Sequence, residues 1–150
     1  MGQVIGMIAA MRGHRVYVDT NIFVYFLERN ADFFSAAAPV IQAIAEKELV
    51  GCTGEIAIAE TMVRPYRSND PAIIATTRDF FETGGFLKIL PHDRTTFYFA
   101  AQLRAAQRIK LIDALHIATA LKAACRYFIT NDKAMRSTGT LNVVQLSSLL

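Results

Sequence analysis

Residues 16–27 read V-Y-V-D-T-N-I-F-V-Y-F-L and predict a strand followed directly by a helix. The β-branched and aromatic run Val16–Val18 is typical of a buried strand. Thr20 and Asn21 are residues that favour the start of a helix, and the apolar run after them predicts its body. Asp19 falls at the turn between the two elements, so a carboxylate follows the first strand.

The same alternation of strand and helix continues along the chain. We expect strands at 49–53, 86–90, 127–130 and 142–145, and helices at 34–48, 55–66, 71–83, 93–108 and 112–124. Pro39 is expected in the first turn of a new helix, and Pro65 is expected to end or bend its helix. Strands that are apolar throughout and alternate with helices indicate a parallel sheet covered on both faces.

Length and composition indicate one globular domain over 1–150. Apolar residues make up 53% of the 150 residues, and charged residues make up 19%, which excludes a disordered chain. The formal charge of +3 and the pI near 9.0 permit nucleic-acid binding without requiring it. Residues 1–13 are predicted to be an N-terminal extension, either flexible or absent if translation starts at Met7 or Met11.

Cysteine content and hydropathy indicate a cytoplasmic protein. Cys52 and Cys125 have no metal-ligand spacing, and we expect two buried free thiols, as in a reducing compartment. No apolar run approaches the ~20 residues that a membrane span requires. The N-terminal apolar stretch has no basic residue before it, so it does not resemble a secretory signal. We therefore expect no membrane association.

Four carboxylates are placed where an α/β fold brings side chains together. Asp19 and Asp132 follow predicted strands, while Glu60 and Asp113 lie in predicted helices. The carboxyl ends of parallel strands share one edge of the sheet, where ligands bind. Carboxylates gathered there repel one another unless a cation lies between them. Four converging acids in a mildly basic chain therefore predict a divalent-metal site that faces an anionic substrate.

Each acid also has an ordinary structural explanation. Asp19 can cap the following helix, although Thr20 and Asn21 can serve as that cap instead. Glu60 is expected on the apolar face of its helix, where an unpaired carboxylate is costly, but a solvated position is the alternative. Asp113 can simply stabilise the first turn of an apolar helix. Asp132 can be a turn residue.

Two further side chains lie one helical turn from these acids. His116 shares the face of Asp113, and we expect a hydrogen-bonded core histidine rather than a metal ligand. Arg64 follows Glu60, and it can pair with carboxylates or contact phosphates at the rim of the site. The sequence has no glycine loop for phosphates, no zinc ligand set, and no Ser or Cys nucleophile with a base.

Four motifs occur in order along the chain: V-Y-V-D-T-N-I-F-V-Y-F-L-E, A-E-T-M-V-R-P, I-D-A-L-H-I-A-T-A and F-I-T-N-D-K. In their order and spacing they resemble the PIN-domain ribonucleases, and within them the VapC-like toxins of VapBC toxin–antitoxin pairs. The resemblance covers about residues 15–146. It implies a three-layer α/β/α sandwich with a central parallel sheet of four to five strands. Residues 1–13 depart from the family pattern, in which the first strand starts almost at the N-terminus.

The resemblance also implies a site and an activity. Asp19, Glu60, Asp113 and Asp132 would hold Mg²⁺ or Mn²⁺, and Thr20 and Thr130 would orient a water or a carboxylate beside them. The activity would be hydrolysis of RNA by a toxin that a cognate antitoxin protein neutralises, with 5′-phosphate and 3′-hydroxyl products. The family commonly forms homodimers, and part of the aromatic region at 23–34 is a candidate interface, with core packing as the alternative.

Three other functions are compatible with an acidic site in an α/β fold. A structure-specific nuclease of the same superfamily would need extra elements to clamp a strand. A phosphoacceptor signalling domain would need paired acids after its first strand and an Asp at the end of its central strand. A binding module without catalysis could keep the fold. The complete set of acids argues against a binding module, and the chain has no spare length for elements that clamp a strand. Asp19 is followed by Thr20 and Asn21, and the third predicted strand ends at Leu90, which argues against a phosphoacceptor domain. The metal-dependent ribonuclease is therefore the favoured function.

Overall fold

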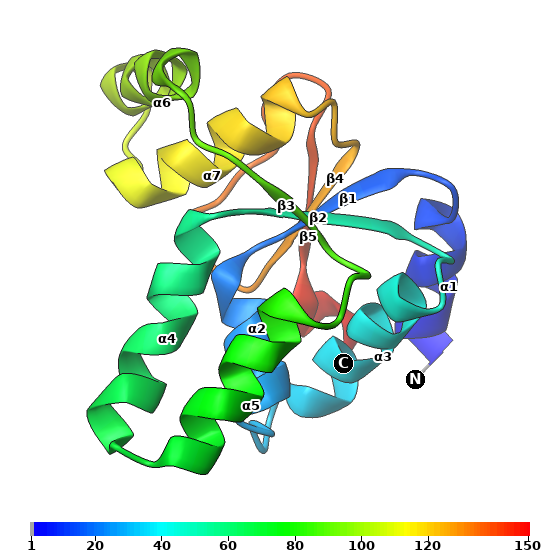
Figure 1. Ribbon diagram of the computed structural model, residues 1–150. Coiled ribbons are helices and arrows are strands. Elements are labelled where there is room, and N and C mark those ends of the chain that lie inside the picture. Colours follow the sequence, from blue (N-terminus) through cyan, green and yellow to red (C-terminus); the bar gives the residue numbers. More distant parts are fainter. Residues whose placement is uncertain (1) are drawn as a thin grey trace.

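The computed structural model describes residues 2–150 and contains a five-stranded parallel sheet (Figure 1). The strands are β1 (Arg15–Val18), β2 (Val50–Gly54), β3 (Lys88–Leu90), β4 (Tyr127–Thr130) and β5 (Asn142–Gln145). Their order in the sheet is β3-β2-β1-β4-β5, and every neighbouring pair is parallel. The predicted parallel α/β sheet is confirmed, and all five strands form near the predicted positions.

Seven α-helices and one short 3-10 helix connect the strands within these residues. They are α1 (Gly2–Met11), α2 (Thr20–Leu27), α3 (Phe34–Ala45), α4 (Ile56–Ser68), α5 (Pro71–Glu82), α6 (Arg94–Ala106), α7 (Leu111–Lys122) and η1 (Leu146–Leu149). Asp70 and Asp93 cap α5 and α6 by accepting backbone N–H bonds, as Asp does at helix starts. The helix that the sequence predicts to be apolar all round is α7, in which residues 114–120 are all buried.

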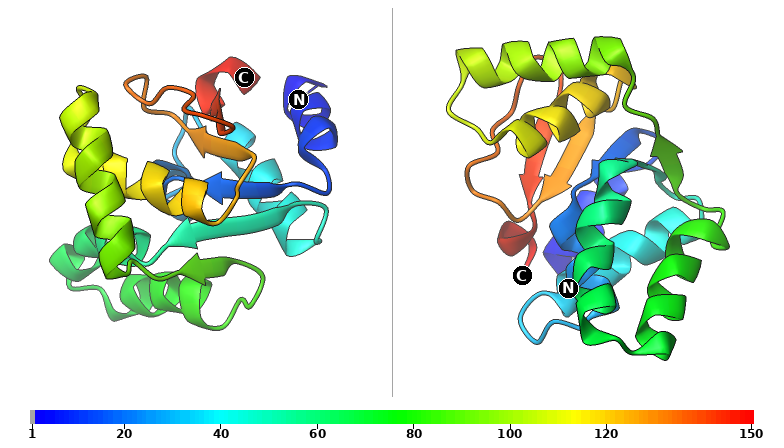
Figure 2. Two further views of the ribbon diagram at one scale, coloured as in Figure 1. Left: turned by 90° about the horizontal axis from the view of Figure 1, so that it is seen from above. Right: turned by 60° about the vertical axis from the view of Figure 1, so that its left-hand side comes forward.

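The sheet separates two hydrophobic cores, which makes the fold a three-layer sandwich. Val16 and Val18 of β1 face the core formed with α1, α2, α3 and α5. Tyr17, between them, faces the opposite core with α6 and α7, as the two-residue period of a strand requires. Figures 1 and 2 show α6 and α7 together on one side of the sheet, away from α1 and α3. The predicted α/β/α layering is therefore confirmed.

The strand order places the end of β1 at the point where the chain changes direction across the sheet. From β1 the chain proceeds outward through β2 to β3, then returns to the other side of β1 as β4 and continues to β5. Val18 pairs with Ile129, so the residues that follow β1 and β4 emerge side by side. Ligands of open α/β sheets bind at such a switch point. Asp19 directly follows β1, and Asp132 is the second residue after β4.

The prediction for Pro39 is wrong, and Pro65 lies inside its helix without ending it. Pro39 is the sixth residue of α3, and it does not lie in the first turn of a new helix. A proline there removes one backbone hydrogen bond, but buried Ala36, Ala37 and Val40 hold the helix to the core. Pro65 does not end α4, which continues to Ser68.

The aromatic region of α2 and the following connection belongs to the core. Phe23 is fully buried, while Tyr25, Phe26 and Phe33 are partly buried against the same core. Tyr25 packs on Phe33 with ring centroids 4.7 Å apart, and Phe26 stacks on Phe34 at 5.8 Å. These contacts account for the apolar character of the region by packing within one chain. A homodimer remains a prediction.

Residues 2–11, within the predicted N-terminal extension, fold as helix α1. Val4, Ile8 and Met11 recur at helical spacing and are buried, and α1 packs against α3 and η1. Figure 1 shows α1 beside the C-terminal end of the chain. A start at Met7 or Met11 would remove part of this buried face. Across residues 2–150, none of the helices has the length and apolar character needed to cross a bilayer.

The contribution of α1 can be measured with a matched pair of substitutions. Ile8 is 8% exposed and Ile5, on the same helix, is 60% exposed. We expect Ile8→Ala to lower the free energy of unfolding by about 2 kcal/mol, because it removes buried methylenes and leaves a cavity. Ile5→Ala should change it by less than about 0.5 kcal/mol. Urea denaturation followed by circular dichroism tests both, and equal effects would contradict the packed position of α1.

Candidate active site

Asp19 is buried at the end of β1 and caps α2. Its Oδ1 accepts the backbone N–H of Thr20 at 2.8 Å, and its Oδ2 accepts the hydroxyl of Thr130 at 2.7 Å. The interpretation that Thr20 or Asn21 would take over the cap is therefore wrong, because Asp19 is the cap residue itself. Burial raises the pKa of Asp19 against the opposing effects of His116, Thr130 and Thr20. The carboxylate is costly to ionise where it lies.

Thr130 connects the segments that follow β1 and β4. Its hydroxyl donates to Asp19, and its oxygen accepts the backbone N–H of Asp132 at 3.0 Å and the side-chain amide of Asn21 at 3.3 Å. Asn21 in turn accepts the backbone N–H of Asn131 through Oδ1 at 3.2 Å. These bonds direct the Thr130 proton toward Asp19 and hold the loop that carries Asp132.

Glu60 reaches the same place from the second turn of α4. Its Oε1 accepts two hydrogen bonds of 2.7 Å, from the Thr20 hydroxyl and from His116 Nε2. Burial works to raise the pKa of Glu60, but these two donors outweigh it and hold the pKa below its ordinary value. Glu60 is thus an ionised acceptor.

The face of α4 that carries Glu60 is not the buried one. The buried residues of this helix are Ala57, Thr61, Met62 and Pro65, while Val63 is 49% exposed. The expectation that Glu60 shares a buried apolar face is therefore wrong. Its side chain is 34% exposed at the edge of the site, so one side of the carboxylate meets its donors and another meets solvent.

Asp113 and Asp132 complete the acidic group. Asp113 lies in the first turn of α7, where the helix dipole favours a carboxylate. Burial, together with the negative charges of Asp132 and Asp19, nevertheless raises the pKa of Asp113 to about 6. Asp132 accepts the backbone N–H of Ala134 at 2.9 Å, so it also shapes its own turn. The electrostatic coupling of Asp19, Asp113 and Asp132 indicates that they share one negatively charged region.

The chemistry of this acidic group fits a hard divalent cation. Its donors are carboxylate oxygens, and burial followed by the negative charges of Asp132 and Asp19 raises the pKa of Asp113. In residues 2–150, no three His, Cys, Asp or Glu side chains lie in an arrangement that could already hold a metal ion together. Mg²⁺ keeps several waters and uses only one or two carboxylates at a time, so it does not need such a preformed set.

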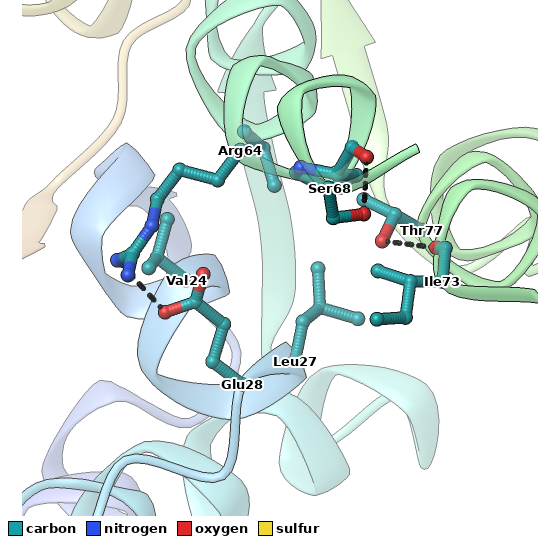
Figure 3. Close-up of a pocket in the computed structure, with 9 residues that line it drawn as sticks. Val24, Leu27, Glu28, Arg64, Ser68, Ile73 and Thr77 are labelled. Atoms are coloured by element: carbon teal, nitrogen blue, oxygen red, sulfur yellow. Dashed lines mark hydrogen bonds and ion pairs between the residues drawn. The ribbon is translucent and has the colours of Figure 1, made fainter. Parts of the chain in front are cut away.

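Arg64 lies apart from the acidic group. It pairs with Glu28 of α2 at 3.1 Å beside a cavity of about 440 Å³ between α2, α4 and α5. Figure 3 shows Val24, Leu27 and Ile73 around the same space, with the Arg64–Glu28 pair at its edge. Both partners are largely exposed, and such surface pairs contribute little to stability. Of the two expectations for Arg64, pairing with a carboxylate describes this structure, although the carboxylate is Glu28.

The sequence interpretation missed Tyr17 and Asn21 as parts of the site. Tyr17 is fully buried, and its hydroxyl lies 2.6 Å from His116 Nδ1. The available signal was its position two residues before Asp19, because alternate residues of a strand share a face. Asn21 was considered only as a helix cap, although its side chain ties Thr130 to Asn131.

The strand order argues against a phosphoacceptor signalling domain. That class uses a doubly wound order in which the third strand is central. Here β3 is an edge strand and ends at Leu90 without an acid. Asp132 instead follows β4, which lies beside β1.

Comparison with known proteins identifies the fold. Residues 16–141 match the PIN domain. VapBC2 from Rickettsia felis, crystallised with a promoter DNA fragment, has a chain 17% identical with a TM-score of 0.69, covering 87% of this chain and 98% of the other. A chain of a toxin–antitoxin complex from Klebsiella pneumoniae is 20% identical with a TM-score of 0.68, covering 87% of this chain and 97% of the other. The chain has no significant sequence match among curated proteins.

A third structural neighbour has a described activity. Mycobacterium tuberculosis VapC20 is described as a toxin that cleaves the sarcin–ricin loop. It is 14% identical to this chain, with a TM-score of 0.61, over 75% of this chain and 86% of the other. At these identities the neighbours establish a shared fold. What they bind or cleave is a property of those proteins.

The repulsion within the acidic group predicts that Asp113→Asn stabilises the metal-free protein. The folded pKa of about 6 lies above the ordinary Asp value, so the contribution of Asp113 to stability is present at low pH and is lost as pH rises through about 6. In EDTA at pH 7.5 we expect Asp113→Asn to raise the free energy of unfolding by about 1 kcal/mol. This is less than the pKa shift alone would give, because solvent screens the partly exposed carboxylate.

The measurement is the melting temperature of both proteins between pH 4 and 8. The gain from Asp113→Asn should shrink as the pH falls below 6. Asp79→Asn, which removes an exposed carboxylate from α5, is the matched control and should have little effect at any pH. A loss of stability in Asp113→Asn at pH 7.5 would show that the carboxylate is favourably paired.

Proposed function

Because this chain belongs to the PIN-domain family, we propose that it is a divalent-metal-dependent endoribonuclease that acts as the toxin of a toxin–antitoxin pair. The observation that carries the proposal is the convergence of acids from four separate segments. Asp19, Glu60 and His116 are joined by contacts of 2.7–3.8 Å, and Asp113 is coupled electrostatically to Asp19 and Asp132. A fold with no use for this negative charge would avoid gathering it.

The residues of the chain have distinct roles in this proposal. Asp19, Glu60, Asp113 and Asp132 would hold Mg²⁺ or Mn²⁺ at the end of the sheet. The bound cation would supply positive charge that acidifies a water and offsets the charge on the scissile phosphate. Thr130 holds Asp19 and Thr20 holds Glu60 by hydrogen bonds of 2.7 Å, so the carboxylates are oriented before substrate arrives.

RNA is the proposed substrate on two grounds. The site lies at an open edge of the sheet, and Glu60, Asp113 and Asp132 are all at least partly exposed, which suits a backbone phosphate of a single strand or loop. VapC20, which has the same fold, is described as cleaving the sarcin–ricin loop. A structure-specific nuclease of the same superfamily is the nearest alternative, and matched RNA and DNA substrates distinguish the two.

The cleavage activity is tested most sharply by Asp19→Asn. The substitution keeps the size of the side chain and a carbonyl oxygen to accept the Thr20 N–H, but it removes the charge that a cation requires. We expect purified protein to cleave RNA in Mg²⁺ or Mn²⁺, and Asp19→Asn to reduce cleavage below detection with the circular dichroism spectrum unchanged. Asp79→Asn should cleave like the parent protein. A fully active Asp19→Asn protein would contradict the proposal.

The toxin role is tested in cells. Induced expression of the chain should arrest bacterial growth, and Asp19→Asn should not. The structural neighbour from Klebsiella pneumoniae was crystallised as a toxin–antitoxin complex, so the proposed partner is an antitoxin encoded beside this chain. Co-expression of the adjacent small open reading frame should restore growth and co-purify with the chain. Growth arrest that persists in Asp19→Asn would show that toxicity does not depend on cleavage.

A further inference from the structure

Glu60 is held through only one of its two carboxylate oxygens. The Thr20 hydroxyl and His116 Nε2 both donate to Oε1 at 2.7 Å. Within residues 2–150, Oε2 makes no hydrogen bond, so it is the oxygen left for a cation or a water. The orientation of Oε2 therefore depends on the two hydrogen bonds to Oε1, and His116 of α7 donates one of them.

The proton on His116 can be assigned from its neighbours. A carboxylate oxygen is an acceptor only, so Nε2 beside Glu60 must carry a hydrogen. The hydroxyl of Tyr17 lies 2.6 Å from Nδ1, and it already accepts the backbone N–H of Gly54 at 2.8 Å. The Tyr17 proton is thereby directed at Nδ1. The result is a chain of hydrogen bonds, here called the relay, that runs from Gly54 through Tyr17 and His116 to Glu60. Every donor in the relay meets an acceptor.

The relay is buried and closely packed. Tyr17 is 0% exposed and His116 is 1% exposed. The Tyr17 ring stacks on Phe128 with centroids 5.1 Å apart and planes 6° from parallel.

Gly54 is required at its position because of this packing. A Cβ there would lie 2.4 Å from His92 Cε1 and 2.8 Å from the Tyr17 hydroxyl, and both distances are closer than real Cβ contacts allow. Only glycine lets the backbone N–H of β2 approach the phenol. The relay therefore joins β2, β1, α7 and α4 by direct contacts between protein groups.

We propose that Tyr17 and His116 are positioning residues that fix the Nε2–H tautomer and thereby leave Glu60 Oε2 free for the cation. This inference rests on the proposed metal-dependent function. It also assigns both nitrogens of His116 to protein contacts, so His116 is not itself a metal ligand. Positioning of this kind is typical of the groups behind metal ligands, whose loss typically costs about 10–100-fold in metal affinity or activity.

Removing the Tyr17 hydroxyl should disturb the tautomer. Without that donor, His116 can place its hydrogen on Nδ1, and Nε2 would then present a lone pair to the Glu60 carboxylate. Two acceptors at 2.7 Å repel each other, so Glu60 would turn away from its present position. Tyr127→Phe is the matched control, because the Tyr127 hydroxyl makes no hydrogen bond among the described residues and lies on neighbouring β4.

The tautomer is read directly by nitrogen NMR of the metal-free, 15N-histidine-labelled protein at pH 7.5. We expect His116 to show an unprotonated Nδ1 and a protonated Nε2. Tyr17→Phe should mix or reverse this pattern, and Tyr127→Phe should preserve it. A protonated Nδ1 in the unsubstituted protein would overturn the inference without any reference to metal binding.

The consequence for the site is read by Mn²⁺ affinity, measured by calorimetry. Tyr17→Phe and His116→Asn should each weaken binding by at least about tenfold. His116→Gln, whose side-chain amide can put a donor where Nε2 lies, should bind within about threefold of the parent protein, well inside that loss. The Gln and Asn variants carry the test if Tyr17→Phe does not fold.

The outcomes separate this inference from the proposed function. Absence of Mn²⁺ binding by the unsubstituted protein would overturn the metal-dependent function. Normal binding by that protein and equal affinities in His116→Asn and His116→Gln would overturn the positioning role alone. Loss in His116→Asn with recovery in His116→Gln would support it, because a merely structural histidine gives no reason for that order.

Discussion

The crowding of carboxylates at the end of β1 is the constraint on which the rest of this structure depends. Asp19 is buried, Asp113 has a pKa raised to about 6, and the charges that raise it include those of Asp132 and Asp19. Such a group costs stability in the absence of a cation. The surrounding donors reduce the cost without removing it, since Thr20, Thr130 and His116 each give a hydrogen bond to a carboxylate.

The sheet topology explains why these groups meet although they are more than a hundred residues apart. Asp19 and Asp132 follow two neighbouring strands at the switch point. Helix α7 lies on one face of the sheet and brings Asp113 and His116, while α4 extends from β2 and brings Glu60. Each element contributes one or two side chains, and the hydrogen bonds between them fix their relative orientation. The site is therefore a property of the whole sandwich.

Much of this arrangement could be predicted from the sequence, because strands and helices differ in their apolar period. The short run at Val16–Val18 and the apolar helix around Ala114 are clear local signals. The four acids could be proposed as a group because parallel strands end at one edge. The structure brings Asp19, Glu60 and His116 into direct contact and couples Asp113 electrostatically to Asp19.

The features that sequence reasoning missed depend on packing between elements. The rotation of α4 about its axis buries Thr61 and exposes Val63, and periodicity alone did not determine it because both sides of that helix carry apolar residues. Pro65 stays inside the same helix because tertiary contacts outweigh a lost hydrogen bond. The Tyr17–His116 contact depends on the register of β1 against β2 and on the depth of α7. Local sequence contains neither quantity.

The central claim is that the acidic group at the end of β1 holds a hard divalent cation. Anomalous diffraction from crystals soaked in Mn²⁺ tests this most directly, because the metal is located independently of the protein phases. The account predicts an anomalous peak in contact with carboxylate oxygens of this group, with Glu60 Oε2 among its neighbours. A peak elsewhere in the molecule, or an empty acidic group in crystals that bind Mn²⁺ at other carboxylates, would contradict it.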